Sequence, residues 1–148
     1  MSTNPASATT PNKSARGVVL LTSLVGSALV LSGCASLAPD GAAAQRVTET
    51  FLTAIADGDG ATACQQLNDS ARETVENETD AGCAEGVLAL NIETEAPASS
   101  GEVYSRAAFV ETGETAVFLT PGDDGWLIRA AGCTPMAEGP FDCLLDGR

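Results

Sequence analysis

The chain has 148 residues, with 20 acidic against seven basic side chains and no histidine, and its formal net charge is −13 at pH 7. Nucleic acids and anionic lipid surfaces are bound by basic faces, so this balance argues against both as partners. Without histidine, serine or cysteine triads that use an imidazole base are excluded.

The first 33 residues have the three parts of a secretory signal peptide. Residues 1–16 carry two charges, Lys13 and Arg16, both positive, and residues 17–31 form an uncharged, mostly apolar run. This run is short for a membrane-spanning helix, which needs about 20 apolar residues. We therefore expect residues 1–33 to be a cleaved signal peptide.

The apolar run leads into Leu31-Ser32-Gly33-Cys34, which resembles the lipobox of bacterial lipoproteins. The resemblance implies that the Cys34 thiol receives a diacylglyceryl group and that cleavage leaves Cys34 as the first residue of the mature chain. Two or more acyl chains, palmitate among them, anchor a protein stably to a membrane. Residues 34–41 would then be the lipidated cysteine and a tether, on the extracytoplasmic face of the cell membrane. An ordinary cleaved signal and an uncleaved anchor helix are the alternatives.

The rest of the chain, residues 42–148, is long enough for one domain. From Cys34 onward the chain holds five arginines against all 20 acidic residues, which is a formal charge of −15. Such acidity indicates recognition of a cationic or basic partner or, more simply, solubility and repulsion from the membrane surface.

Four cysteines remain besides Cys34, an even number that fits disulfides in an oxidising compartment. Of the three possible connectivities, proximity along the chain favours Cys64–Cys83 and Cys133–Cys143. A zinc site is the alternative, but the chain has neither a C-x-x-C spacing nor a histidine. We expect two disulfides, no metal and no other cofactor.

The first half of the domain has the periodicity of helices. Residues 41–57 place apolar side chains at three- and four-residue steps, and Gly58 follows as a C-terminal stop. Asp59 is expected to cap a second helix that carries Cys64.

Two further helix starts are predicted from polar residues. Ser70 has capping-box spacing to Glu73 and would begin one or two helical turns. Asp80 would cap a third helix that runs from Cys83 toward residue 91. The first disulfide would then join the second predicted helix to the third.

The second half changes to the patterns of strands. Residues 103–111, 115–120 and 126–131 are rich in β-branched and aromatic side chains, and turn sequences separate them. Short connections predict an antiparallel meander, with a fourth short strand over residues 141–145. Helices followed by strands predict an α+β domain.

Several sequence stretches resemble actinobacterial lipoproteins of the nuclear-transport-factor-2-like superfamily: the helix end at 57–59, Cys-Ala-Glu at 83–85, the run at 125–135 and Phe-Asp-Cys at 141–143. The likeness covers residues 42–145. It implies N-terminal helices packed on a curved antiparallel sheet, a cone with a cavity at its open end. The superfamily includes isomerases and polyketide cyclases as well as non-catalytic binding modules, so the fold alone does not choose the function.

An isomerase-like site would need a carboxylate base and a buried donor such as a tyrosine. Tyr104 is expected beside Arg106 on one face of a strand, and neither matches a catalytic position of those enzymes. We therefore expect a membrane-tethered, non-catalytic domain that binds a small apolar ligand or a protein partner. An isomerase- or cyclase-like enzyme using carboxylate acid–base chemistry is the alternative. Five large apolar residues are the candidates for lining the cone: Phe51, Ile55, Phe109, Phe118 and Trp126.

Overall fold

The computed structural model describes residues 40–148. The expected signal peptide, Cys34 and the tether up to residue 39 lie outside the described residues. Within the described part, no helix is both long and apolar enough to cross a membrane. The predicted boundaries after residues 33 and 41 therefore stay predictions.

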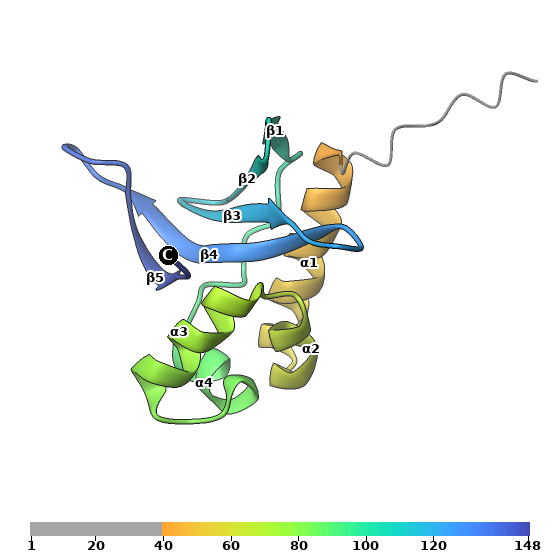
Figure 1. The fold of residues 1–148 in the computed structure, drawn as a ribbon. Helices are drawn as coiled ribbons and strands as arrows, with labels where there is room; N and C mark the ends of the chain where they lie inside the picture. Colours follow the sequence, from red (N-terminus) through yellow and green to blue (C-terminus); the bar gives the residue numbers. More distant parts are fainter. Residues whose placement is uncertain (1–39) are drawn as a thin grey trace, which may run out of the picture. The chain divides into compact units, whose positions relative to one another are not determined.

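The described chain folds as four helices followed by five strands (Figure 1). The helices are α1 Gly41–Ala56, α2 Gly60–Gln65, α3 Asp69–Thr79 and α4 Cys83–Ala89. The strands are β1 Glu102–Tyr104, β2 Ala107–Thr112, β3 Thr115–Pro121, β4 Trp126–Pro135 and β5 Phe141–Asp146. Neighbouring strands are antiparallel in the order β1-β2-β3-β4-β5, so the sheet is an open meander. The predicted α+β class, with helices before an antiparallel sheet, is confirmed.

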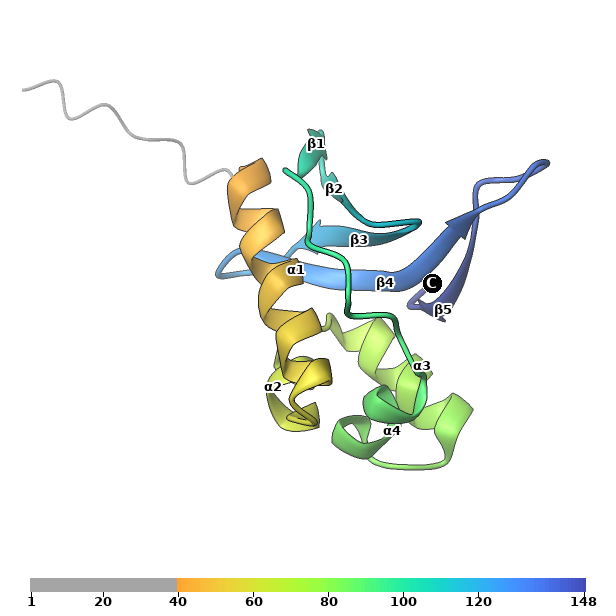
Figure 2. The ribbon, with the colours of Figure 1, turned by 180° about the vertical axis from the view of Figure 1, so that it is seen from behind.

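The helices pack together against one face of the sheet (Figures 1 and 2). α1 and α3 contact the strands, and α2 and α4 pack against these two helices. The core between the layers is apolar, and burying each large side chain in it contributes about 1.5–3 kcal/mol. Five fully buried side chains show how all layers contribute: Phe51, Val75, Val87, Leu119 and Ile128.

Aspartate side chains define the starts of the first two helices. Asp40 accepts a hydrogen bond from the N–H of Ala43 at 2.6 Å, and Asp59 accepts from the N–H and hydroxyl of Thr62 at 3.0 and 2.6 Å. Both hydrogen bonds from Thr62 hold the pKa of Asp59 below its usual value, and the bond from the hydroxyl has the larger effect. The cap therefore stabilises α2 fully at pH values above the ordinary pKa of an aspartate. This stabilisation is lost as the pH falls through the lowered pKa of Asp59. Gly58, with a φ of +73°, ends α1 as predicted.

The starts of α3 and α4 differ from the sequence-based prediction. Asn68, and not Ser70, caps α3, since its side chain accepts the N–H of Ala71 at 2.9 Å. This helix continues for 11 residues because Ala71 and the apolar residue one turn later face the core. Asp80 does not cap α4 but ends α3 in the left-handed conformation, and Gly82 precedes α4 without a side-chain cap.

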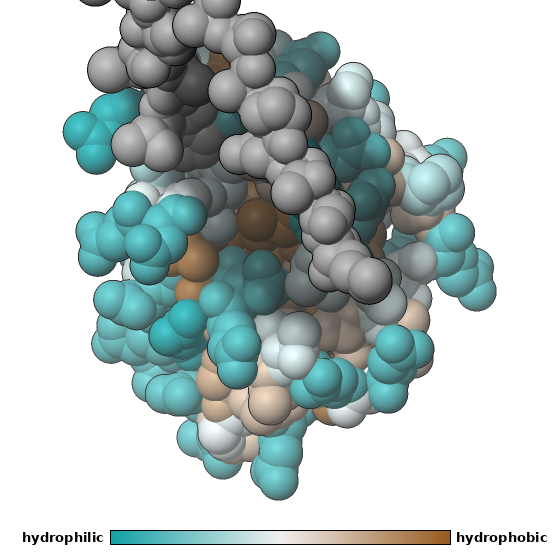
Figure 3. Space-filling view, turned by 90° about the vertical axis from the view of Figure 1, so that its right-hand side faces the viewer, coloured by the Kyte–Doolittle hydropathy of each residue, from teal (hydrophilic) through white to brown (hydrophobic). Residues whose placement is uncertain are grey.

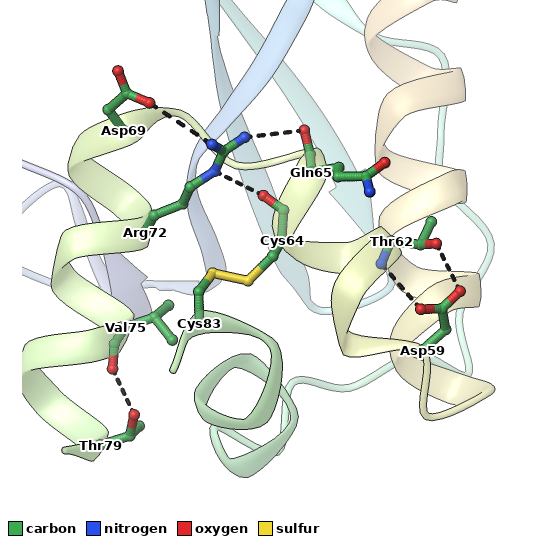
Figure 4. The surroundings of a disulfide bond; sticks show 9 residues. All are labelled: Asp59, Thr62, Cys64, Gln65, Asp69, Arg72, Val75, Thr79 and Cys83. Atoms are coloured by element: carbon green, nitrogen blue, oxygen red, sulfur yellow. Dashed lines mark hydrogen bonds and ion pairs between the residues drawn. A yellow bond between two sulfur atoms is a disulfide. The ribbon is translucent and has the colours of Figure 1, made fainter. Parts of the chain in front are cut away.

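The disulfide Cys64–Cys83 joins α2 to the start of α4 (Figure 4). Beside it, Arg72 of α3 donates from Nε to the carbonyl of Cys64 at 2.9 Å and reaches the carbonyl of Gln65 at 3.5 Å. These carbonyls belong to the last turn of α2, where C=O groups lack partners within the helix. One arginine and one disulfide therefore hold the six-residue helix α2 to α3 and α4.

The substitution Gly60→Ala should lower the free energy of unfolding by about 1–3 kcal/mol, the usual cost of overpacking. A Cβ atom at Gly60 would collide with the backbone carbonyl of Ala84, so α2 and α4 would have to separate. Urea unfolding followed by circular dichroism measures the change. Gly82→Ala is the matched control, because nothing lies within 4 Å of a Cβ there. Equal stability of the two variants would contradict this close approach.

Candidate ligand-binding groove

The five residues predicted to line one cavity divide between the two faces of the sheet. Phe51 and Trp126 are buried in the core beneath the helices, and Ile55 packs against that core. Phe109 and Phe118 pack on the opposite face, in a second apolar cluster. The structure does not bring the five together, because successive side chains of a strand point to opposite faces.

The second cluster is built on three phenylalanine rings. Phe109 of β2 and Phe118 of β3 are directly opposite each other, with ring centroids 5.3 Å apart. Phe141 of β5 completes the group at 5.0 Å from Phe118 and 6.0 Å from Phe109. These separations are in the range that favours tilted and edge-to-face aromatic pairs. All three rings are half-buried, so part of each remains exposed on the surface.

The short ring distances across two intervening strands indicate a curved sheet. Two strands lie between β2 and β5, and at about 4.8 Å per strand spacing a flat sheet would separate them by about 14 Å. The rings of Phe109 and Phe141 are 6.0 Å apart, so this face is concave. Register shifts on either side of Phe118 and a left-handed residue, Gly132 with φ +62°, bend the long strand β4. Figure 1 shows that the connected ends of β4 and β5 point away from the helices, while β5 runs back toward α3.

The disulfide Cys133–Cys143 lies in the same cluster as the rings. The two cysteines are directly opposite each other on β4 and β5, with a Cα–Cα distance of 3.9 Å. Ala116 and Ala130 are buried beside Cys133, and their small side chains leave room for the rings. The disulfide therefore fixes the hairpin that carries Phe141.

A hollow of about 470 Å³ opens beside the rings, within the range of about 300–1,000 Å³ usual for small-molecule sites. We call it the aromatic groove. Met136, 47% exposed in the β4–β5 connection, forms part of its apolar wall. The full lining consists of Phe118, Arg129, Ala130, Met136, Pro140, Phe141, Cys143, Asp146 and Arg148.

A second hollow, of about 550 Å³, lies on the α1 side of the domain, against the β3–β4 turn. Its lining includes Arg46 of α1 together with Asp123 and Asp124 of the turn. Figure 3 views the domain from this side and shows mainly hydrophilic side chains around a smaller apolar area. The aromatic groove is therefore the better candidate for an apolar ligand.

The residues considered for acid–base chemistry are exposed. Tyr104 is 62% exposed, and its hydroxyl donates to Glu102, which raises the pKa of the phenol above its usual value. The predicted strand pair of Tyr104 and Arg106 is wrong, because Arg106 lies in the turn between β1 and β2. Among residues 40–148, the buried polar side chains are those of Thr48 and Thr112, so no carboxylate there is buried beside a donor.

Comparison of the chain with protein-family models, with curated proteins and with solved structures found no match. Within the described residues, no group of histidine, cysteine, aspartate and glutamate side chains is arranged to hold a metal ion. The importance of the aromatic groove therefore rests on its own geometry.

The sequence patterns did not point to Phe141, Met136, Arg129 or Arg148 as groove residues. One signal was present: β2 and β3 carry apolar side chains on both faces, which indicates that the second face is also covered. The arginines gave no such signal, because their position depends on how the hairpin and the C-terminus fold back.

Replacing both Cys133 and Cys143 by serine should lower the free energy of unfolding by about 3 kcal/mol, from the chain entropy of a closed loop. The freed hairpin should also weaken the NMR contacts between the rings of Phe118 and Phe141. The control replaces Cys64 and Cys83 by serine, which removes a disulfide of comparable loop entropy far from the rings. Ring contacts that persist in the first variant would refute the role of this disulfide in shaping the groove.

Proposed function

We propose that this protein is a membrane-tethered, extracytoplasmic lipoprotein whose domain binds a small apolar ligand in the aromatic groove. One observation carries the proposal: three of the four phenylalanines of the chain are half-buried in this cluster, on the sheet face that the described helices leave uncovered. Large aromatic side chains stabilise a fold most when they are fully buried. Their partial exposure in one concave cluster is typical of a binding surface.

The lipobox-like sequence around Cys34 supports the membrane anchor. In this proposal residues 1–33 are the signal peptide, and acylated Cys34 starts the mature chain. A tether of about seven residues spans about 15 Å by random-coil scaling, so the domain works close to the bilayer. Trp126 donates its indole N–H to the carbonyl of Asp40 at 3.0 Å, so the β3–β4 turn lies near the point where the tether enters.

We also propose that the chain is related to the nuclear-transport-factor-2-like lipoproteins and has a cone-like form. The curvature of the sheet and the order of helices before strands support this relation. The proposed ligand site then lies elsewhere than the cavity that the resemblance implies between the helices and the sheet. Phe51 and Trp126 are buried in that space, and the aromatic groove lies on the other face.

An enzyme using carboxylate acid–base chemistry is the less supported function. Such a site needs an aspartate or glutamate that is desolvated and faces a hydrogen-bond donor. The buried polar side chains of residues 40–148 are threonines, which cannot act as that base. A binding function, in contrast, needs no catalytic group among the described residues.

The anchor is tested by Cys34→Ala. Because no other residue can accept the thioether-linked lipid at this position, the variant should accumulate as an unprocessed precursor that lacks the acyl chains. Mass spectrometry of the chain from its own membrane measures both properties. Normal cleavage of this variant and its retention at the membrane would refute the proposed lipid anchor.

The binding site is tested by NMR titration of the full chain with decan-1-ol, a neutral apolar probe. The chain carries Cys34→Ser, so that it has no acyl chain of its own to compete. Phe118→Ser should weaken binding about tenfold or more, since an aromatic pair and its buried area are lost together. Met136→Ser should weaken binding by a smaller factor, and at this exposed position it should leave the fold intact.

Leu144→Ser is the matched control, because Leu144 is an apolar residue of β5 that is 49% exposed and does not line the groove. It should bind decan-1-ol as the parent chain does. Absence of binding by the parent, or equal binding by the Phe118 and Leu144 variants, would overturn the proposed site.

A further inference from the structure

We infer that the ligand of the aromatic groove is an amphiphile with an apolar tail and an anionic head, and that Arg129 and Arg148 hold the head. This inference rests on the proposed function, because it assigns the chemical class of the ligand for that same groove. Two of the five arginines of the folded domain line this one hollow, in a region that carries 20 acidic residues.

The charge of the groove lining is opposite to that of the other hollows. Its charged side chains are two arginines against one aspartate, so positive side chains are in excess. Four other hollows of the described residues have acidic side chains in excess. The charged side chains of the first of these hollows are Arg46, Asp123 and Asp124, and those of the second are Arg46, Glu49, Asp57 and Asp59. Those of the third are Glu93, Glu95 and Glu114, and those of the fourth are Glu93 and Asp142.

The two guanidinium groups are available to a ligand. Arg129 donates from Nε to the carbonyl of Gly147 at 3.2 Å and forms no ion pair with any of the described residues. That bond fixes the position of the group while both Nη atoms keep their donors. A guanidinium group in this state binds carboxylate or phosphate oxygens through two parallel hydrogen bonds.

Asp146 is the one carboxylate in the lining, and it is paired. Arg148 donates from Nε to Oδ2 of Asp146 at 2.6 Å, and the Arg148 side chain is 82% exposed. The pair reduces the repulsion that Asp146 would exert on an anionic head. Arg148 keeps its Nη groups for the ligand, while Asp146 orients the Arg148 side chain.

The acidity of the whole domain does not prevent such binding. At physiological ionic strength, charges separated by more than about 8 Å of water are largely screened. Direct contacts with Arg129 therefore dominate once the head group has arrived. The rings and Met136 take the tail, so the groove has an apolar part and a cationic part side by side.

The inference is tested with the full chain carrying Cys34→Ser, titrated by NMR with decanoate, decyl phosphate and decan-1-ol below micelle-forming concentrations. Decanoate, decyl phosphate or both should bind about two- to fivefold more tightly than decan-1-ol, and only the anions should bind more weakly at raised salt. Comparing the affinities for the two anions shows whether the groove prefers a carboxylate or a phosphate head. Arg129→Gln should weaken binding of the anions about two- to fivefold and leave decan-1-ol unchanged, and adding Arg148→Gln should weaken it further.

Arg106→Gln is the matched control. It removes the same charge from an exposed turn residue that does not line the groove, and should leave all three affinities within about twofold. Equal affinities for the alcohol and both anions, or a loss in Arg129→Gln that is the same for the alcohol, would overturn the anionic head while leaving the proposed groove intact. Failure of all three probes to bind would overturn the proposed function as well.

Discussion

The bend of β4 at Gly132 is the constraint on which both faces of the sheet depend. Ile128 and Ala131 belong to the core beneath the helices, whereas Ala130, before the bend, and Cys133, after it, belong to the aromatic cluster on the other face. The φ of +62° at Gly132 is a conformation that residues with a Cβ adopt only with strain. Because Cys133 is bonded to Cys143, β5 follows the bend. One strand thereby serves the helical core and the groove at once.

The aromatic residues are divided between the helical core and the opposite face of the sheet. Of the four phenylalanines, Phe51 alone is fully buried in the helical core, which consists otherwise mainly of alanine, valine and leucine side chains. A core of small residues buries less apolar area, and disulfides are a common compensation in small extracytoplasmic domains. The link from Cys64 and the hydrogen bonds of Arg72 hold α2, which is too short to be stable alone. The other three phenylalanine rings lie on the opposite face, where we propose that they bind a ligand.

Local sequence patterns predict the helices and strands better than they predict the aromatic groove, for a physical reason. The first helix, the cap at Asp59 and the antiparallel meander depend on neighbours a few residues away, so local patterns predict them. The strand expected over residues 103–111 is instead two strands, β1 and β2, separated by a turn. The groove depends on contacts between β2 and β5 across two intervening strands, which no local pattern contains. The errors at Ser70 and Asp80 are local: Asn68, two residues earlier, caps α3, and Asp80 adopts a left-handed conformation that ends this helix. The resemblance to a cone-shaped superfamily implied one cavity for five large apolar residues, but of these Phe118 alone lines the groove, and Phe51 and Trp126 are buried in the helical core.

The acidity of the domain and the position of the groove are compatible in the proposed lipoprotein. An exposed apolar cluster on a tether of about 15 Å could insert into the bilayer that anchors it. Many carboxylates oppose such insertion, because charged groups near the cluster would have to lose their hydration and would be repelled by anionic lipids. The groove then stays open to molecules in the aqueous phase, and its two arginines give anions a local site in an otherwise acidic surface. We therefore propose that the net charge of the domain keeps the groove accessible and that the two groove arginines select an anionic ligand.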